Sequence, residues 1–167
     1  RLLEDDLSGE PAELSQRLQR LVAVNEPTVV TVGFLRRQLE QGEAPGLQHS
    51  AAATLGAAAF NLARTGDAAQ ADRLARLLLK RLVSGDPADV RPAVDALGNS
   101  GRPVVVPALV ALAGSADAEV RAAVARASRR MPEHPSLSAL LRDEAPAVQH
   151  AAIEALETQG KGLQSIV

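Results

Sequence analysis

Asp86-Pro87-Ala88-Asp89-Val90-Arg91-Pro92-Ala93-Val94 is the stretch that decides the fold of this 167-residue chain. It returns with few changes as Asp117-Ala118-Glu119-Val120-Arg121-Ala122-Ala123-Val124, at a spacing of 30 residues. A third copy, Val148-Gln149-His150-Ala151-Ala152, follows after 28 residues, and a fourth, Leu47-Gln48-His49-Ser50-Ala51, precedes the first by 43. Recurrence at a nearly fixed interval indicates a tandem array of one supersecondary unit.

Turn-forming residues divide the chain between these copies into segments of helical length. Asp67, Asp86 and Asp117 stand where a helix N-cap is expected, and Pro87 and Pro146 suit a first helical turn. The predicted helices come in pairs, in which the first helices cover 28–41, 68–83, 104–113 and 136–142, and the second helices cover 46–64, 87–99, 118–130 and 146–158.

The composition favours helices alone. Ala and Leu contribute 32 and 24 residues, and both are strong helix formers. Aromatic residues make up 1% of the chain, so strand signals are scarce. The Val runs at 29–30 and 104–106 follow Pro27 and Pro103, where helices are expected to begin. We therefore predict an all-α protein.

Charge and residue usage exclude several classes of site. The chain has 18 basic and 20 acidic residues, a net charge of −2, so no overall field attracts nucleic acid or anionic lipid. The absence of Cys excludes a disulfide framework, a thiolate zinc site and a cysteine nucleophile. No apolar run is long enough to predict a membrane span. Because the chain begins at Arg1 without Met, we expect an excerpt of a longer protein, and no compartment is predicted.

A single helical pair cannot bury its own apolar face, so the pairs are expected to stack into a solenoid. We predict one domain over residues 1–167, with about four pairs between 27 and 158 and an extra helix near 10–23. The ends, 1–8 and 160–167, are expected to be the least ordered parts. The second helices are expected to line the concave face, the usual binding surface of such arrays.

The repeated residues resemble those of the HEAT repeat, most closely the short bacterial type named after phycobilisome lyases. The resemblance covers about 27–158 and is clearest at 86–131. It implies a right-handed α-solenoid of antiparallel helical pairs. It also implies that the Val of each copy belongs to the core and that the polar residues form a ladder between repeats. The residues assigned to this ladder are Asp86, Arg91, Asp117 and Arg121.

A weaker resemblance involves the order His49-Ser50-Ala51, then Ala96-Leu97-Gly98-Asn99, then Val120-Arg121-Ala122-Ala123. It is similar to the helical domain of vitellogenin-like lipid transfer proteins, in which helical pairs and β-sheets together enclose a lipid cavity. A lipid ligand would require a broad apolar surface that remains after the helices have packed.

Candidate catalytic and metal-ligating residues are few. His49, His134 and His150 are far apart in sequence, and only His150 has a carboxylate one helical turn away, at Glu154. We interpret this pair as an exposed helical contact rather than half of a metal site. Ser50 follows His49 directly, but consecutive helical side chains diverge, so we interpret it as a small packing residue. No catalytic residue and no cofactor is predicted.

Two arginine-rich segments bear on nucleic-acid binding: Arg73, Arg76, Lys80 and Arg81 in one, and Arg121, Arg126, Arg129 and Arg130 in the other. Base stacking requires free aromatic rings, and Phe34 and Phe60, the only aromatic residues, are predicted to be core. We interpret the arginines as solvated helix faces, which disfavours nucleic acid as a partner.

The function that the sequence predicts is a non-enzymatic scaffold or adaptor that binds another protein on its concave face. The exposed residues predicted to contact the partner are Asp95, Arg126, Arg129 and His150. Two alternatives stay open at this stage: the helical part of a vitellogenin-like lipid carrier, and an enzyme similar to tetrapyrrole (bilin) lyases.

Overall fold

The computed structural model of the protein describes residues 13, 29–41, 45–82 and 87–164, and all regular elements in these ranges are helical. The elements, in which η denotes a 3₁₀-helix, are α2 (Val29–Gln41), α3 (Pro45–Arg64), α4 (Ala68–Leu82), α5 (Pro87–Ser100), η2 (Pro103–Val105), α6 (Val106–Leu112), α7 (Ala118–Ala127), η3 (Ser128–Arg130), α8 (Leu137–Leu140) and α9 (Pro146–Gln164).

The predicted all-α class is confirmed, and the helices lie close to the predicted ranges. The segment 118–130 ends as the 3₁₀-helix η3, where the Ser128 hydroxyl donates to the Val124 carbonyl oxygen at 3.0 Å. The segment 136–142 forms only the short α8. Helix α9 continues past Gly160 to Gln164, and the expectation that 160–167 is among the least ordered parts stays a prediction. The helix predicted near 10–23 falls, apart from residue 13, outside the described residues, as do 1–8.

Local signals set several helix ends. The Asp67 carboxylate accepts from the Gln70 backbone N–H at 2.9 Å, and Asp117 accepts from Glu119 N–H at 2.8 Å, so both residues act as N-caps. Helix α5 ends before Gly101, whose φ of 57° is the left-handed conformation that favours glycine at a helix C-terminus.

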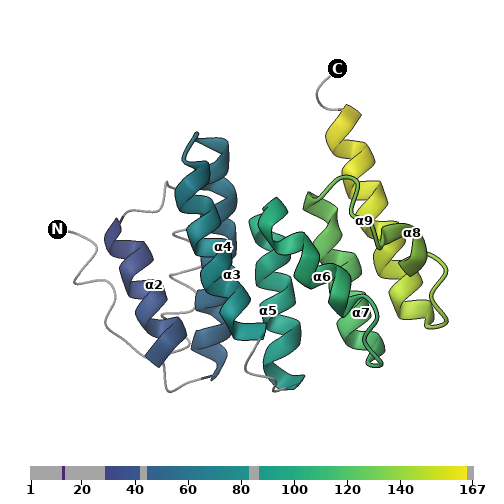
Figure 1. The fold of residues 1–167 in the computed structure, drawn as a ribbon, viewed down its shortest axis with the longest axis horizontal. Coiled ribbons are helices and arrows are strands. Elements are labelled where there is room, and N and C mark those ends of the chain that lie inside the picture. The colour runs from purple at the N-terminus through teal and green to yellow at the C-terminus, as the bar shows by residue number, and fades with distance from the viewer. Residues whose placement is uncertain (1–12, 14–28, 42–44, 83–86, 165–167) are drawn as a thin grey trace.

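The helices form two layers. Helices α3, α5, α7 and α9 pack side by side as the second-helix layer. The first helices, α2, α4, α6 and α8, pack onto it, each against its own partner in the second-helix layer. The elements follow one another in chain order along the long axis of the molecule, from α2 to α9 (Figure 1). Contacts between successive elements and between alternate ones are those expected for a stack of repeats.

The core is a continuous cluster of Leu, Ala and Val that runs through both layers. Val120 and Val148, the recurring Val of the second and third copies, are buried, and Val90 is partly buried against the same cluster. Helix α3 is buried on most sides, since neighbours pack against it from α2, α4 and α5. Burying these side chains supplies the main favourable free energy of folding.

Two glycines allow the second helices to approach one another closely. A Cβ atom on Gly56 would lie 2.1 Å from the carbonyl oxygen of Ala96 in α5. A Cβ atom on Gly98 would lie 2.5 Å from the Cα and Cβ atoms of Ala127 in α7. Both glycines are helical and have ordinary φ angles, so close packing and not backbone conformation explains them.

The two Phe residues differ from each other. Phe34 packs against the core cluster, as predicted. Phe60 is half-buried, and the Arg130 guanidinium lies 4.4 Å from its ring centroid, with that of Arg64 at 5.9 Å. The prediction that Phe60 is a core residue is therefore wrong, because its position near the end of α3 brings the ring beneath arginine side chains from α3 and η3.

Candidate functional site

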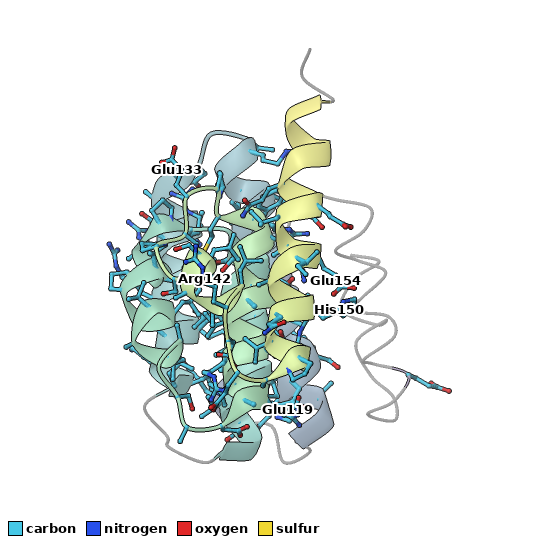
Figure 2. All side chains as sticks on the ribbon, turned by 90° about the vertical axis from the view of Figure 1, so that its right-hand side faces the viewer. Glu119, Glu133, Arg142, His150 and Glu154 are labelled. Carbon is cyan, nitrogen blue, oxygen red and sulfur yellow. The ribbon has the colours of Figure 1, made fainter. Side chains whose placement is uncertain are left out.

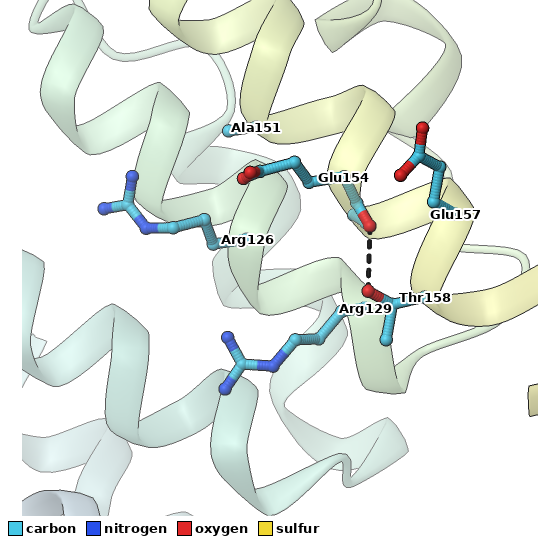
Figure 3. Close-up of a pocket in the computed structure, with 7 residues that line it drawn as sticks. Arg126, Arg129, Ala151, Glu154, Glu157 and Thr158 are labelled. Atoms are coloured by element: carbon cyan, nitrogen blue, oxygen red, sulfur yellow. Dashed lines mark hydrogen bonds between the residues drawn. The ribbon is translucent and has the colours of Figure 1, made fainter. Parts of the chain in front are cut away.

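A groove of about 300 Å³ lies between α7 and α9. Its charged side chains are the guanidinium groups of Arg126 in α7 and Arg129 in η3 and two carboxylates from α9 (Figure 3). The floor is formed by small apolar residues. The residues that line the groove are Arg126, Arg129, Ala151, Glu154, Ala155, Glu157 and Thr158.

Packing below the groove fixes its two walls. Ala151 and Ala155 of α9 are buried, and being small they leave space above them for the longer side chains at the rim. The side chain of Glu154 extends from α9 toward Arg126, and Glu157 rises on the far side (Figure 3). The Thr158 hydroxyl donates to the Glu154 backbone carbonyl oxygen at 2.9 Å, so it is not free to rotate toward the groove. The groove thus has a basic wall and an acidic wall.

The predicted contact residues Asp95, Arg126 and Arg129 are brought together by the packing of α5 against α7. Arg126 Nε lies 3.8 Å from Asp95 Oδ1, and Arg129 Nη2 donates to Asn99 Oδ1 at 2.6 Å. Desolvation raises the pKa of Asp95, although the charges of Arg126, Arg129 and Arg91 act in the opposite direction. These side chains extend the groove toward α5.

His150 lies on the same helix as the acidic wall. Its Nε2 is 3.3 Å from Glu154 Oε1, and both side chains are exposed, at 75% and 58%. They lie on one flank of α9, whereas Arg142 and Glu133 lie on the opposite side of the molecule (Figure 2). The pair has the geometry of an exposed i, i+4 contact, and Arg126, Arg129 and Glu154 line the groove without His150.

Arg121, a ladder residue of the second copy, forms a buried ion pair with Asp143. Arg121 is 8% exposed, and its Nε and Nη2 donate to the two carboxylate oxygens of Asp143 at 2.8 and 2.9 Å. Its Nη1 also donates to the carbonyl oxygen of Ser115 at 2.8 Å. These hydrogen bonds, donated by Arg121 to Asp143, hold the pKa of Asp143 below its ordinary value and raise the pKa of Arg121. The sequence interpretation of Arg121 as a solvated face residue is wrong, because oxygen atoms of Ser115, Ala116 and Asp143 surround its guanidinium group.

In the first copy the same Val-Arg pair has different neighbours. Arg91 Nη1 lies 3.3 Å from Glu119 Oε2, with side-chain exposures of 51% and 59%. Asp117 serves as the N-cap of α7, and Arg91 donates to Glu119 instead of to Asp117. Asp86 lies outside the described residues. Sequence reasoning missed Asp143, although its position just before Pro146, at the start of a second helix, was a usable signal.

Arg81 of α4 ties the first two helix pairs, α2 with α3 and α4 with α5, together. Its guanidinium donates to the Leu39 carbonyl oxygen at 3.1 Å, to Gln48 Oε1 at 3.0 Å and to Asp89 Oδ1 at 3.4 Å. His49 Nε2 lies 3.3 Å from the same Asp89 oxygen. Arg81 therefore belongs to a partly buried network and not to a solvated face, in contrast to the interpretation from sequence. Arg73 and Arg76 of the same segment are exposed.

The three histidines lie in separate places. His134 is 5% exposed, and burial lowers its pKa. Its Nδ1 accepts from the Ser136 backbone N–H at 3.4 Å, while Nε2 has no hydrogen-bond partner. Among the described residues, no group of three or more His, Asp or Glu side chains could hold a metal ion.

The apolar surface is small. The exposed large apolar side chains in the described ranges are Val110 on α6 and Ile153 and Leu156 on α9. The helices that the structure describes include none with the length and apolar character needed to cross a bilayer.

The two-layered stack of paired helices and its interhelical groove define the molecule as an all-helical repeat protein. Residues 75–157, from α4 to α9, match the family model of HEAT repeats. No curated protein matches the chain.

Proposed function

We propose that the protein is a non-enzymatic scaffold that binds another protein on the concave face formed by its second-helix layer. The observation that carries the proposal is the groove between α7 and α9, which presents Arg126, Arg129, Glu154 and Glu157 on packed helices. HEAT repeats are commonly protein-interaction scaffolds, and the match at 75–157 covers this groove.

The physical basis is preorganisation. Helices α7 and α9 are fixed by the buried pair of Arg121 with Asp143 and by Gln159, whose side-chain amide donates to the Ser128 carbonyl oxygen at 2.7 Å. A partner that enters the groove therefore loses little free energy in ordering this surface. A groove with one basic and one acidic wall favours a partner that places acidic side chains against the basic wall and basic side chains against the acidic wall.

The proposal includes a finer description of the fold. The helical pairs wind as a right-handed superhelix of the short bacterial HEAT type, and the second helices line its concave side. The continuous second-helix layer of α3, α5, α7 and α9 supports this arrangement. A lipid carrier would need a broad apolar surface, and the polar groove with three exposed large apolar side chains in the described ranges does not favour it. No observation favours a bilin lyase.

The test uses a photo-crosslinking amino acid placed at Glu157 in the groove and, as a matched control, at the exposed Arg76 on α4. A partner identified by crosslinking from Glu157 is then purified, and its Kd is measured against the wild type and against Arg126→Glu. We expect Arg126→Glu to weaken binding about tenfold, since it reverses a charge on the basic wall. Arg76→Glu, which makes the same charge change on the first-helix layer, should leave the Kd unchanged. Equal losses in both variants, or a partner that crosslinks from Arg76 alone, would overturn the proposal.

A further inference from the structure

Two arginines lie over one aromatic ring beside the groove, and a third arginine is their neighbour. Arg64 and Arg130 lie over Phe60, at 5.9 and 4.4 Å from its centroid, and Arg129 adjoins Arg130 in η3. Together with Asn99 these residues form what we call the arginine cluster. The cluster lies where α3, α5 and η3 end.

The arginines of the cluster are held in place by neutral groups. Asn99 accepts two hydrogen bonds of 2.6 Å, one at Oδ1 from Arg129 and one at its backbone carbonyl oxygen from Arg130. Phe60 supports Arg130 by a cation–π contact. These contacts fix the positions of the guanidinium groups without neutralising them.

Among the described carboxylates, Asp95 is close enough to Arg129 for the two charges to interact, but it forms no ion pair with the cluster. Within the described part of the chain, Arg64, Arg129 and Arg130 form no ion pair, whereas Arg81, Arg91, Arg102, Arg121 and Arg126 each do. Burial lowers the pKa of Arg130, and the nearby charge of Arg129 lowers it further. An anion placed between these groups would relieve the repulsion and accept directed hydrogen bonds.

We propose that the arginine cluster binds the carboxylates of an acidic segment in the partner protein, next to the α7–α9 groove. Arg129 belongs to both surfaces, so a segment seated on the cluster continues directly into the groove. This inference rests on the proposed function and specifies the chemistry of the partner. A peptide is favoured over nucleic acid because the Phe60 ring is covered by Arg130 and is not free to stack on a base.

The test measures binding of a fluorescein-labelled octaglutamate peptide by fluorescence anisotropy, with the whole 167-residue chain. The comparison ligands are an octaglutamine peptide and a single-stranded oligonucleotide of equal charge. The double variant Arg64→Gln/Arg129→Gln removes two cluster charges, and Arg73→Gln/Arg76→Gln removes two exposed charges from α4 as the matched control. We expect the octaglutamate Kd to rise about tenfold in the cluster variant and to stay within about twofold of wild type in the control.

Arg64→Gln alone changes an exposed residue and keeps the test valid if the double variant folds poorly. Failure of octaglutamate to bind, an equal loss in the α4 control, or tighter binding of the oligonucleotide would overturn the inference. The proposed function is tested separately by crosslinking. A crosslinked partner whose Kd depends on Arg126 would support the scaffold function even if the octaglutamate experiment contradicted the preference for acidic segments.

Discussion

Neighbouring second helices are joined by different interactions in different parts of the molecule. The two contacts compared are that of α5 with α7 and that of α7 with α9. Between α5 and α7, Gly98 lets the backbones touch at Ala127, and the pair of Arg91 with Glu119 is exposed. Between α7 and α9, the buried ion pair of Arg121 with Asp143 fixes one end of the contact. The polar side chains above Ala151 do not fill the space between the helices, so a groove remains there. Close packing at a glycine fixes the first pair of helices, and a buried ion pair fixes the second pair, which carries the groove.

The largest effect is expected from closing the space at Gly98. In Gly98→Ala, the new methyl group would overlap Ala127, so α5 and α7 must separate, and we expect a loss of about 1–3 kcal/mol of unfolding free energy. Urea denaturation followed by circular dichroism measures this loss. Gly33→Ala is the matched control, because Gly33 is exposed in α2 with no atom near its Cβ position, and it should stabilise by up to about 1 kcal/mol. A Gly98→Ala variant as stable as the wild type would show that the close approach is not needed.

A smaller effect, dependent on pH, is expected at the contact of α7 with α9. Because Arg121 lowers the pKa of Asp143 from its ordinary value of 3.8, the ion pair stabilises the fold above that pH and loses its effect as the pH falls through the lowered value. Asp143→Asn should therefore lower the thermal midpoint by several degrees at neutral pH. The difference from wild type should shrink below about pH 4. A difference that stays constant down to about pH 2 would contradict the assigned role of the carboxylate.

The smallest effect is expected at the corresponding pair between α5 and α7. Arg91 and Glu119 are both more than half exposed at the side chain, so water screens their attraction. Arg91→Ala should change the unfolding free energy by less than about 0.5 kcal/mol in the same urea experiment, and Glu119→Ala should behave alike. A loss as large as that of Gly98→Ala would mean that the ladder is a main stabilising element in both contacts.

The fold was predictable because local signals and the repeat agree. The N-caps Asp67 and Asp117 and the recurring Val120 and Val148 were all readable from the chain. The site was readable only in part. Sequence reasoning named Arg126 and Arg129 but not Glu157, since nothing in the pattern of α9 shows which helix lies opposite. Asp143 and Phe60 were misjudged for the same reason: their roles depend on arginines 22 and 70 residues away.

The sequence by itself determined that the chain is helical, where most helices begin and end, and that the modules repeat, because these properties depend on neighbours within a few residues or on the spacing of the copies. Only the tertiary structure decided which charges are neutralised. Arg121 and Arg130 stand in the same helical segment of the sequence, and one faces a carboxylate while the other faces an aromatic ring. The energy of a charged group depends on distances of a few ångströms to groups far away in the chain, and packing alone sets those distances.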